Sequence, residues 1–413
     1  MSSVPSIEQT DQPSGDRKTI LFIFVMICLD LLCAGMVIPV IPALVGQFNQ
    51  NALAIGLLAV TFYSAQFIAT PALGVLSDRH GRRPILLLCI LGTGVAYFLF
   101  GAANALWLLF LGRLIDGATG GNISVALAYI SDVSSPETRA KNFGLIGAAF
   151  GIGFIIGPAV GGFLSLISLQ TPALAAGVLS VIITIFGFFL LPESLAPEQR
   201  RKRIALAELN PLRQVRDALR PRILRRLLLS NFAQNFAFSG LQTNFVLYTF
   251  VRYGLDPAQN GLIFAYIGFL SGLMQGVITG ILVERFRERR LAAAGLALMM
   301  LGYAALALAP EVWSIYGAMT LIAVGSGLST PTLTSIITKQ VSSEEQGSIL
   351  GASQAIDSIA LMIGPVWAGL AFDYFGPTSP YWTGAVWLFI AVLFVASAYK
   401  KRKLARKPLL KLD

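Results

Sequence analysis

Apolar stretches of about 20 residues recur along this whole sequence, and they constrain its fold more than any other feature. A stretch of this length crosses a bilayer as a helix, because lipid offers no hydrogen-bond partner to backbone amides. Only 13% of the 413 residues are charged, and the mean hydropathy is +0.71; soluble globular proteins carry about 25% charged residues. These values exclude a water-soluble fold, a disordered chain and a coiled coil. The stretches also lack the apolar–polar alternation of outer-membrane barrel strands.

Twelve such stretches predict an all-α membrane protein with twelve transmembrane helices. An even number of spans places both ends of the chain on the same side of the membrane. The expected spans are residues 19–44, 52–76, 84–103, 107–131, 141–166, 172–192, 225–250, 259–283, 290–309, 312–337, 347–372 and 379–399.

Positive charge is concentrated on one side of these spans. Of the 31 lysine and arginine residues, 29 lie in the terminal segments or in the loops of one side, whereas the opposite loops hold Arg252 and one span holds Arg113. By the positive-inside rule that side is the cytoplasm. We therefore expect a multi-pass protein of the cell (inner) membrane with both termini cytoplasmic. This distribution explains the net charge of +10 without nucleic-acid binding.

The two halves of the sequence repeat one another. Gly74–Arg79, which closes the second span, recurs as Gly280–Arg285 at the end of the eighth span, 206 residues later. Gly157-Pro158 in the fifth span recurs as Gly364-Pro365 in the eleventh, 207 residues later. Parallel repeats with a site at their interface are an architecture of transporters. We expect a cytoplasmic tail (1–18), a six-helix bundle (19–192), a basic cytoplasmic linker (193–224), a second six-helix bundle (225–399) and a basic cytoplasmic tail (400–413).

Four charged side chains lie deep inside predicted spans and not at their ends, and a charge at such depth costs about 2.5–3.5 kcal/mol on insertion scales. Asp30 either exchanges protons or binds substrate, or it is satisfied by a helix terminus or a hydroxyl group. Arg113 and Asp116 stand three residues apart and can pair along one helix. Asp357, in the eleventh span, is either a coupling residue or a polar contact between helices.

The seventh span carries a row of carboxamides. These side chains are expected to line a polar cavity, although hydrogen bonding between helices explains the pattern almost as well. The row comprises Asn231, Gln234, Asn235, Gln242 and Asn244.

Four motifs resemble those of the major facilitator superfamily, in its twelve-helix drug:proton antiporter branch. The resemblance covers about residues 19–399, and its likeness to tetracycline exporters is strongest in the N-terminal half. The motifs are Leu29-Asp30 followed by Pro39–Pro42, the loop Gly74–Pro84 (GVLSDRHGRRP), Leu111-Gly112-Arg113 with Gly117, and an antiporter-type set in the fifth span, Gly153, Gly157, Pro158, Gly161 and Gly162.

The resemblance implies roles for these positions. It supports proton coupling by Asp30 and gives Arg113 a part in it. The loop after the second span is expected to be a cytoplasmic gate in which Asp78 caps a helix N-terminus. Its arginines either pair with Glu137 or Asp132, or only set the topology. The gate residues are Gly74, Asp78, Arg79, Gly81, Arg82 and Arg83.

In this fold the fifth and eighth helices meet between the two halves, and both carry glycines spaced four residues apart. Such stripes allow helix backbones to approach closely. We therefore expect a glycine-lined seam along which the halves slide. The stripes are Gly153, Gly157 and Gly161 in the fifth span, and Gly268, Gly272, Gly276 and Gly280 in the eighth.

These features together predict a secondary transporter that exports small hydrophobic compounds or drugs in exchange for protons, by alternating access. The alternative is a sugar or metabolite uniporter or symporter of the same fold. Pro192-Glu193-Ser194 after the sixth span resembles the signature of sugar porters. Tetracycline exporters carry acidic residues in their third and ninth helices, whereas spans 84–103 and 290–309 contain none. The substrate class therefore stays open.

The expected partners are the lipid bilayer, a small-molecule substrate and protons, and the expected state is a monomer. The sequence contains no nucleotide-binding loop, metal-ligand cluster or catalytic triad. We accordingly expect no enzyme activity, no cofactor and no metal, with transport driven by a gradient.

Overall fold

The computed structural model describes residues 17–49, 51–134, 136–200, 215–216, 218–341 and 346–398. Within these residues every secondary-structure element is a helix, as the sequence predicts. Of the predicted tails and linker, residues 1–16, residues 201–214 and 217 of the linker 193–224, and the whole of 400–413 lie outside the described residues.

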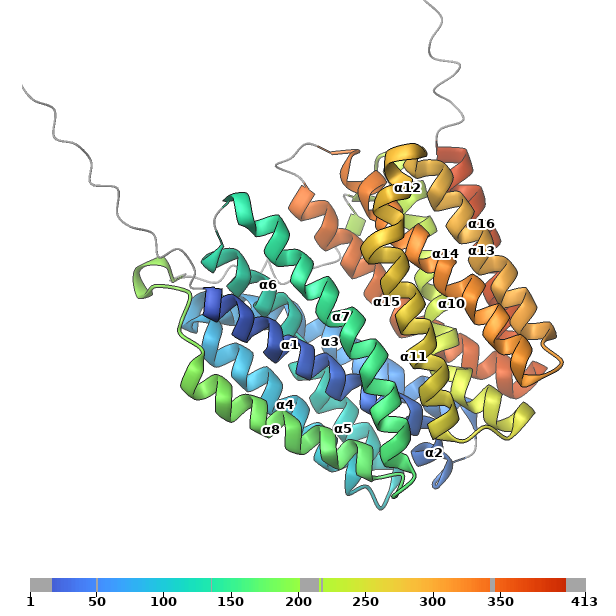
Figure 1. Ribbon diagram of the computed structural model, residues 1–413, viewed down its shortest axis with the longest axis horizontal. Coiled ribbons are helices and arrows are strands. Elements are labelled where there is room, and N and C mark those ends of the chain that lie inside the picture. The colour runs from blue at the N-terminus through green and yellow to red at the C-terminus, as the bar shows by residue number, and fades with distance from the viewer. Residues whose placement is uncertain are drawn as a thin grey trace, which may run out of the picture.

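The helices form two bundles, each around its own apolar core (Figure 1). The first bundle comprises α1 (Arg17–Val37), η1 (Ile38–Val40), α2 (Ile41–Gly46), α3 (Ala52–His80), α4 (Arg82–Gly101), α5 (Leu106–Thr119), α6 (Asn122–Val133), α7 (Pro136–Ser165) and α8 (Thr171–Leu190). A single-turn helix, η2 (Pro197–Gln199), follows it. The second bundle comprises α10 (Arg222–Tyr253), α11 (Pro257–Leu273), the π-helical turn η4 (Met274–Ile278), α12 (Thr279–Arg285), α13 (Glu288–Leu308), α14 (Val312–Thr338), α15 (Gln346–Phe375) and α16 (Ser379–Ala398).

Nine helices among the described residues are long and apolar enough to cross a membrane. The expected span 107–131 is not one of them, because its helix is broken at Gly120-Gly121 between α5 and α6. Neither is 141–166, where the apolar helical stretch Gly151–Ser165 is shorter than a full span, nor 225–250, which forms the polar-rich α10. The chain is thus a multi-pass membrane protein, and the number twelve stays a prediction.

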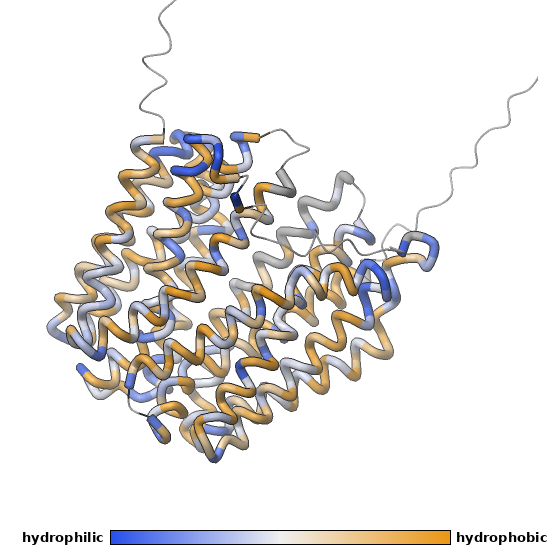
Figure 2. The backbone as a smooth tube through the Cα atoms, turned by 180° about the vertical axis from the view of Figure 1, so that it is seen from behind, coloured by the Kyte–Doolittle hydropathy of each residue, from blue (hydrophilic) through white to orange (hydrophobic). Residues whose placement is uncertain are grey.

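Apolar side chains cover the outside of the bundles, where a soluble protein would carry polar ones. Figure 2 shows hydrophobic residues along the lengths of the helices and hydrophilic residues gathered near the helix ends. Large apolar side chains such as Ile68, Phe189 and Trp313 are at least three-quarters exposed. This surface matches a lipid environment.

The bundles approach each other at one end of the molecule. We call the end where α1 begins and α16 ends the terminal end, and the opposite one the distal end. Figure 1 shows the bundles converging toward the distal end, where α7 lies beside α11, and α3 also packs against α15. These pairs are related by the duplication, because α3 corresponds to α11 and α7 to α15.

Glycines make the distal contacts close. A Cβ atom at Gly56 would lie 2.5 Å from the carbonyl oxygen of Pro365, and one at Gly261 would lie 2.4 Å from that of Pro158. Toward the terminal end, a Cβ at Gly74, Gly272, Gly276 or Gly280 would meet no atom within 4 Å. These glycines place the close backbone contacts between the bundles toward the distal end.

Candidate functional site

Asp30 is a buried carboxylate in the middle of α1, 7% exposed. Its Oδ2 accepts a hydrogen bond from the Nδ2 of Asn122, whereas its Oδ1 is buried without a hydrogen-bond partner in the described structure. A small cavity beside it is lined by Ile27, Leu86, Ile90, Asn122 and Ile123. An acceptor oxygen left without a donor in a cavity is a place where a proton can bind.

Asn122 reaches Asp30 because the fourth predicted span is not one continuous helix. The backbone breaks at Gly120-Gly121, and Asn122 is the first residue of α6. Asn122 is not among the site residues that the sequence predicts. The available signal was a polar residue directly after two glycines in an otherwise apolar span.

Arg113 and Asp116 form the pair expected from their spacing. The Nη1 of Arg113 lies 3.2 Å from the Oδ2 of Asp116, one helical turn apart in α5. The guanidinium group also lies over the rings of Phe62 and Phe100, 5.4 and 5.1 Å from their centroids. Cation–π contacts and a carboxylate together allow a guanidinium to stay buried. The geometry is confirmed, and the coupling role stays a prediction.

Asp357 belongs to the second bundle, so the structure does not join it to Asp30. Its Oδ1 accepts hydrogen bonds from the Nδ2 atoms of Asn231, at 2.5 Å, and Asn235, at 3.0 Å. Asn231 also donates to Ser353 at 3.3 Å. Two carboxamides on one carboxylate oxygen stabilise the charge, and among the described residues neither of them occupies Oδ2.

The remaining carboxamides of the seventh span do not share this cluster. Gln234 donates to the hydroxyl group of Thr330 on α14 at 2.9 Å. Asn244 is fully buried, and both polar atoms of its side chain lack a hydrogen-bond partner in the described residues. Gln242 is partly buried. Asn231 and Asn235 therefore share one acceptor and Gln234 has another, while a common polar cavity lined by the row stays a prediction.

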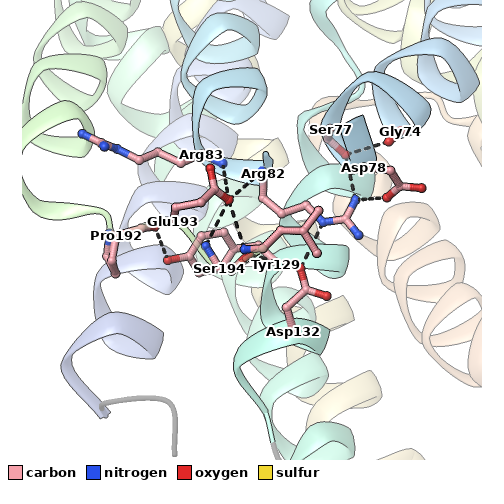
Figure 3. Close-up of polar contacts among 11 residues, drawn as sticks. Gly74, Ser77, Asp78, Arg82, Arg83, Tyr129, Asp132, Pro192, Glu193 and Ser194 are labelled. Atoms are coloured by element: carbon pink, nitrogen blue, oxygen red, sulfur yellow. Dashed lines mark hydrogen bonds and ion pairs between the residues drawn. The ribbon is translucent and has the colours of Figure 1, made fainter. Parts of the chain in front are cut away.

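The predicted gate loop forms a cluster at the terminal end of the first bundle (Figure 3). Arg82 donates to Asp78, to the hydroxyl group of Ser77 at 2.8 Å and to the Oδ2 of Asp132 at 3.0 Å. Asp132 is thus confirmed as an acidic partner of the loop. The side chain of the other candidate, Glu137, lies outside the described residues. Arg79 is exposed.

The expectation that Asp78 caps the next helix is wrong. Asp78 lies in the last turns of α3, and the N-terminus of α4 is capped by Glu193. The Oε1 of Glu193 accepts from the backbone amides of Arg82 at 2.8 Å, Ser194 at 3.0 Å and Leu195 at 3.2 Å. A carboxylate is stabilised there because a helix N-terminus carries unpaired N–H groups and partial positive charge.

Gly81 permits this arrangement. Its φ of +107° and ψ of 154° lie in a region that only glycine adopts readily. A Cβ atom here would lie 2.3 Å from the Oε2 of Glu193. The arginine next in the loop, Arg83, donates to the carbonyl oxygen of Phe188, and Tyr129 donates to that of Pro192 at 2.7 Å. These contacts fasten the end of α8 to α4 and α6.

The predicted glycine seam is partly wrong. The stripe of α7 faces α1 in its own bundle, because Cβ atoms at Gly153, Gly157 and Gly161 would meet Leu31, Leu32 and Met36 at 2.7, 2.7 and 2.0 Å. Spacing shows that a helix face is flat, but it does not show which neighbour covers that face.

The contact between α7 and α11 uses other glycines. A Cβ atom at Gly162 would lie 3.0 Å from the Cα of Ala258, and one at Gly268 would lie 2.8 Å from the carbonyl oxygen of Phe154. Gly272, Gly276 and Gly280 of the predicted stripe have no such neighbour. The meeting of the two helices is confirmed, but the seam is shorter than expected.

Comparison with known proteins agrees with this architecture. The family model described as Major Facilitator Superfamily matches residues 23–279 and 252–411. The tetracycline resistance protein, class C, of Escherichia coli is 34% identical over 382 residues, which is 92% of this chain and 95% of that protein. The class H protein of Pasteurella multocida is 30% identical over 402 residues, covering 95% and 98%. The crystal structure of the human organic anion transporter MFSD10 (TETRAN) gives a TM-score of 0.71 at 25% identity, covering 92% of this chain and 99% of that chain.

Proposed function

Because the chain belongs to the Major Facilitator Superfamily, we propose that it exports small hydrophobic compounds or drugs in exchange for protons, by alternating access. The observation that carries this proposal is Asp30, a buried carboxylate with one oxygen held by Asn122 and the other without a partner in the described structure. Ionisable groups inside membrane bundles mark proton and substrate pathways. The tetracycline resistance proteins among its relatives support export over uptake.

The terminal end is proposed to face the cytoplasm. The gate cluster around Arg82 lies at this end, as do the exposed Arg79 and the start of α10 with its arginines. Positive charge is retained on the cytoplasmic side of membrane proteins. We accordingly assign the protein to the inner membrane with cytoplasmic termini, and the distal end to the outer face. We also propose that it functions as a monomer. The bundles touch at the distal end, so the state described here is closed toward the outside.

Transport requires the two bundles to rock about their shared seam. We assign proton coupling to Asp30, with the pair of Arg113 and Asp116 beside its route in the first bundle. In the second bundle, Asp357 with Asn231 and Asn235 supplies polar contacts for the substrate or a second proton. Asp30 then moves with the first bundle, and Asp357 moves with the second.

The substrate set is expected to differ from that of the tetracycline exporters. The acidic residues that those exporters carry in their third and ninth helices have no counterpart within 84–103 and 290–309. Glu288, which begins α13, pairs with Lys339 at 2.7 Å at the terminal end. We therefore infer an apolar or weakly polar drug-sized molecule, and we expect transport without covalent chemistry.

The test is proton release from acid-loaded, everted membrane vesicles that contain the protein. Tetracycline, lipophilic cations, other antibiotics and sugars are added one at a time, and a pH-sensitive dye in the lumen reports proton loss. Asp30→Asn is measured beside the unaltered protein. Glu198→Gln is the matched control, because it removes an exposed carboxylate that belongs neither to the bundle interior nor to the gate residues.

A compound that discharges the gradient only when Asp30 is intact would establish antiport and identify the substrate class. Discharge that is equal in Asp30→Asn would overturn the coupling assignment. Sugar flux that needs no gradient would favour a uniporter instead.

A further inference from the structure

The helix α3 begins without a cap of its own. Asn51 precedes it, and the side chain of Asn51 makes no capping hydrogen bond. The first amides of a helix need acceptors from outside the helix. Here they receive them from Asp373, 321 residues away in the sequence, near the end of α15. Asp373 Oδ1 accepts from the amide of Ala52 and Oδ2 from that of Leu53, both at 2.9 Å.

The corresponding helix of the second bundle is capped differently. The N-terminus of α11 lies 205 residues after that of α3, close to the offset of the duplication. Its own Asp256 accepts from the amide of Gln259 at 2.8 Å, and Gln259 accepts from the amide of Asp256 at 3.0 Å. This is a complete capping box within one bundle. Of these two related helices, only α3 takes its cap from the opposite bundle.

The cap lies on the seam between the bundles. A Cβ atom at Gly369, one turn before Asp373 on α15, would lie 2.9 Å from the carbonyl oxygen of Ala52 and from the Cα of Leu53. Gly56, one turn further along α3, contacts Pro365. The backbones of α3 and α15 are thus in direct contact along the stretch that carries the cap. If the bundles separate here, Asp373 moves away and α3 loses both acceptors.

We propose that Asp373 is a latch between the bundles, which caps α3 from the opposite half and thereby stabilises the state closed at the distal end. Opening at this end breaks both hydrogen bonds, whereas the capping box of α11 is unaffected. The inference rests on the proposed alternating access. It implies that the exporter rests in the state that receives substrate from the terminal end, and that release of the latch is one step of the outward opening.

The test measures the distance between the distal ends of the two bundles. Spin labels are attached at Ile167→Cys, in the loop after α7, and at Tyr374→Cys, at the end of α15. These side chains are 75% and 78% exposed, so the labels do not disturb the seam. The three native cysteines, Cys28, Cys33 and Cys89, are replaced by serine or alanine, and double electron–electron resonance gives the populations of short and long distances.

The informative comparison is between Asp373→Ala and the double variant Asp373→Ala/Asn51→Asp. The double variant gives α3 a cap within its own bundle, which restores the helix but not the link. We expect Asp373→Ala to lower the ratio of short to long distances on the order of tenfold, the usual effect of losing a cap. The double variant should recover the thermal stability of the parent and keep the altered distance ratio.

Recovery of the distance ratio in the double variant would show that Asp373 only caps a helix, and would overturn the latch. An unchanged ratio in Asp373→Ala would overturn it too. Should Asp373→Ala fold poorly, the double variant still gives the decisive distances. The measurement needs no substrate, so a failure of the proposed antiport in vesicles stays distinguishable from a failure of the latch.

Discussion

At the scale of single residues, Gly81 shows how one position holds the gate cluster together. Alanine at this position would occupy a backbone region that is essentially restricted to glycine, which costs about 1–3 kcal/mol, and its Cβ would also overlap Glu193. We expect Gly81→Ala to lower the melting temperature of the purified protein and to slow transport.

Gly254→Ala is the matched control for this prediction. Gly254 also has a positive φ, +68°, but a Cβ atom there meets nothing within 4 Å. Its cost is therefore confined to the left-handed backbone, about 1–2 kcal/mol. Equal losses of stability in the two variants would show that the contact with Glu193 contributes nothing.

Asn122 is expected to be a positioning residue for Asp30. Asn122→Ala removes the donor to Oδ2 and leaves both carboxylate oxygens without a protein partner among the described residues. A hydrogen bond to a charged group contributes about 1.5–3 kcal/mol, so we expect proton-coupled transport to fall at least tenfold, measured as the initial rate of proton release from vesicles.

Asn235→Ala provides the comparison, because Asp357 keeps its bond to Asn231 when this donor is lost. We expect Asn235→Ala to lower the initial rate of proton release less than Asn122→Ala does. A rate in Asn122→Ala equal to that of the unaltered protein would remove Asn122 from the coupling site.

The sequence predicts the residues whose partners are near in the chain more readily than those whose partners are distant. Arg113 and Asp116 are one turn apart, so helical geometry alone pairs them. Glu193 and Asp373 are not predicted as capping residues, because each caps a helix more than a hundred residues away in the sequence. Such contacts depend on how helices pack, which local pattern does not contain.

At the scale of elements, the glycine stripe of α7 predicts a role in packing within the first bundle, and not in sliding between the bundles. Gly157 contacts Leu32 and Gly35 of α1 inside its own bundle, and α1 carries Asp30. We expect Gly157→Leu to separate α1 from α7 and to reduce the amount of folded protein, and not merely to block the motion of an intact molecule. Size-exclusion chromatography in detergent and the melting temperature measure this.

Gly272→Ala serves as the control for the stripe, because a Cβ atom there meets nothing within 4 Å. It should leave folding and transport within about twofold of the parent, as expected for a substitution without a steric conflict. A well-folded but inactive Gly157→Leu protein would restore the sliding interpretation.

Hydropathy predicts the existence of the helices well, because burial in lipid acts on each segment separately. It does not predict the break at Gly120-Gly121, where α5 ends and α6 begins. Apolar segments lie on both sides of this point, so their combined length predicts a single span although Gly120, Gly121 and Asn122 interrupt it. The break nevertheless sets the position of Asn122 and hence the environment of Asp30.

At the scale of the whole molecule, the duplication predicts two related bundles, and the family resemblance predicts that the fifth and eighth helices meet between them. It does not predict the difference between them. The caps of α3 and α11 differ, and Asp30 has no acidic counterpart near the matching part of α10, where Gln234 instead bonds to Thr330. Because the two bundles share a fold but carry different side chains, each can have a different role in the transport cycle.

A cross-link across the seam tests whether the bundles must separate. In the protein without native cysteines, Ala52→Cys and Asp373→Cys place two thiols at residues that are now joined by a 2.9 Å hydrogen bond. A disulfide forms where the two Cα atoms lie within about 7 Å, and its formation is checked by non-reducing electrophoresis before transport is measured. We expect oxidation to stop transport and a reductant to restore it, because the distal end can no longer open. The single-cysteine variants, treated with the same oxidant, should keep their rates. Full transport by the cross-linked protein would mean that α3 and α15 stay together throughout the cycle, and the motion of the bundles would have to be assigned to another pair of helices.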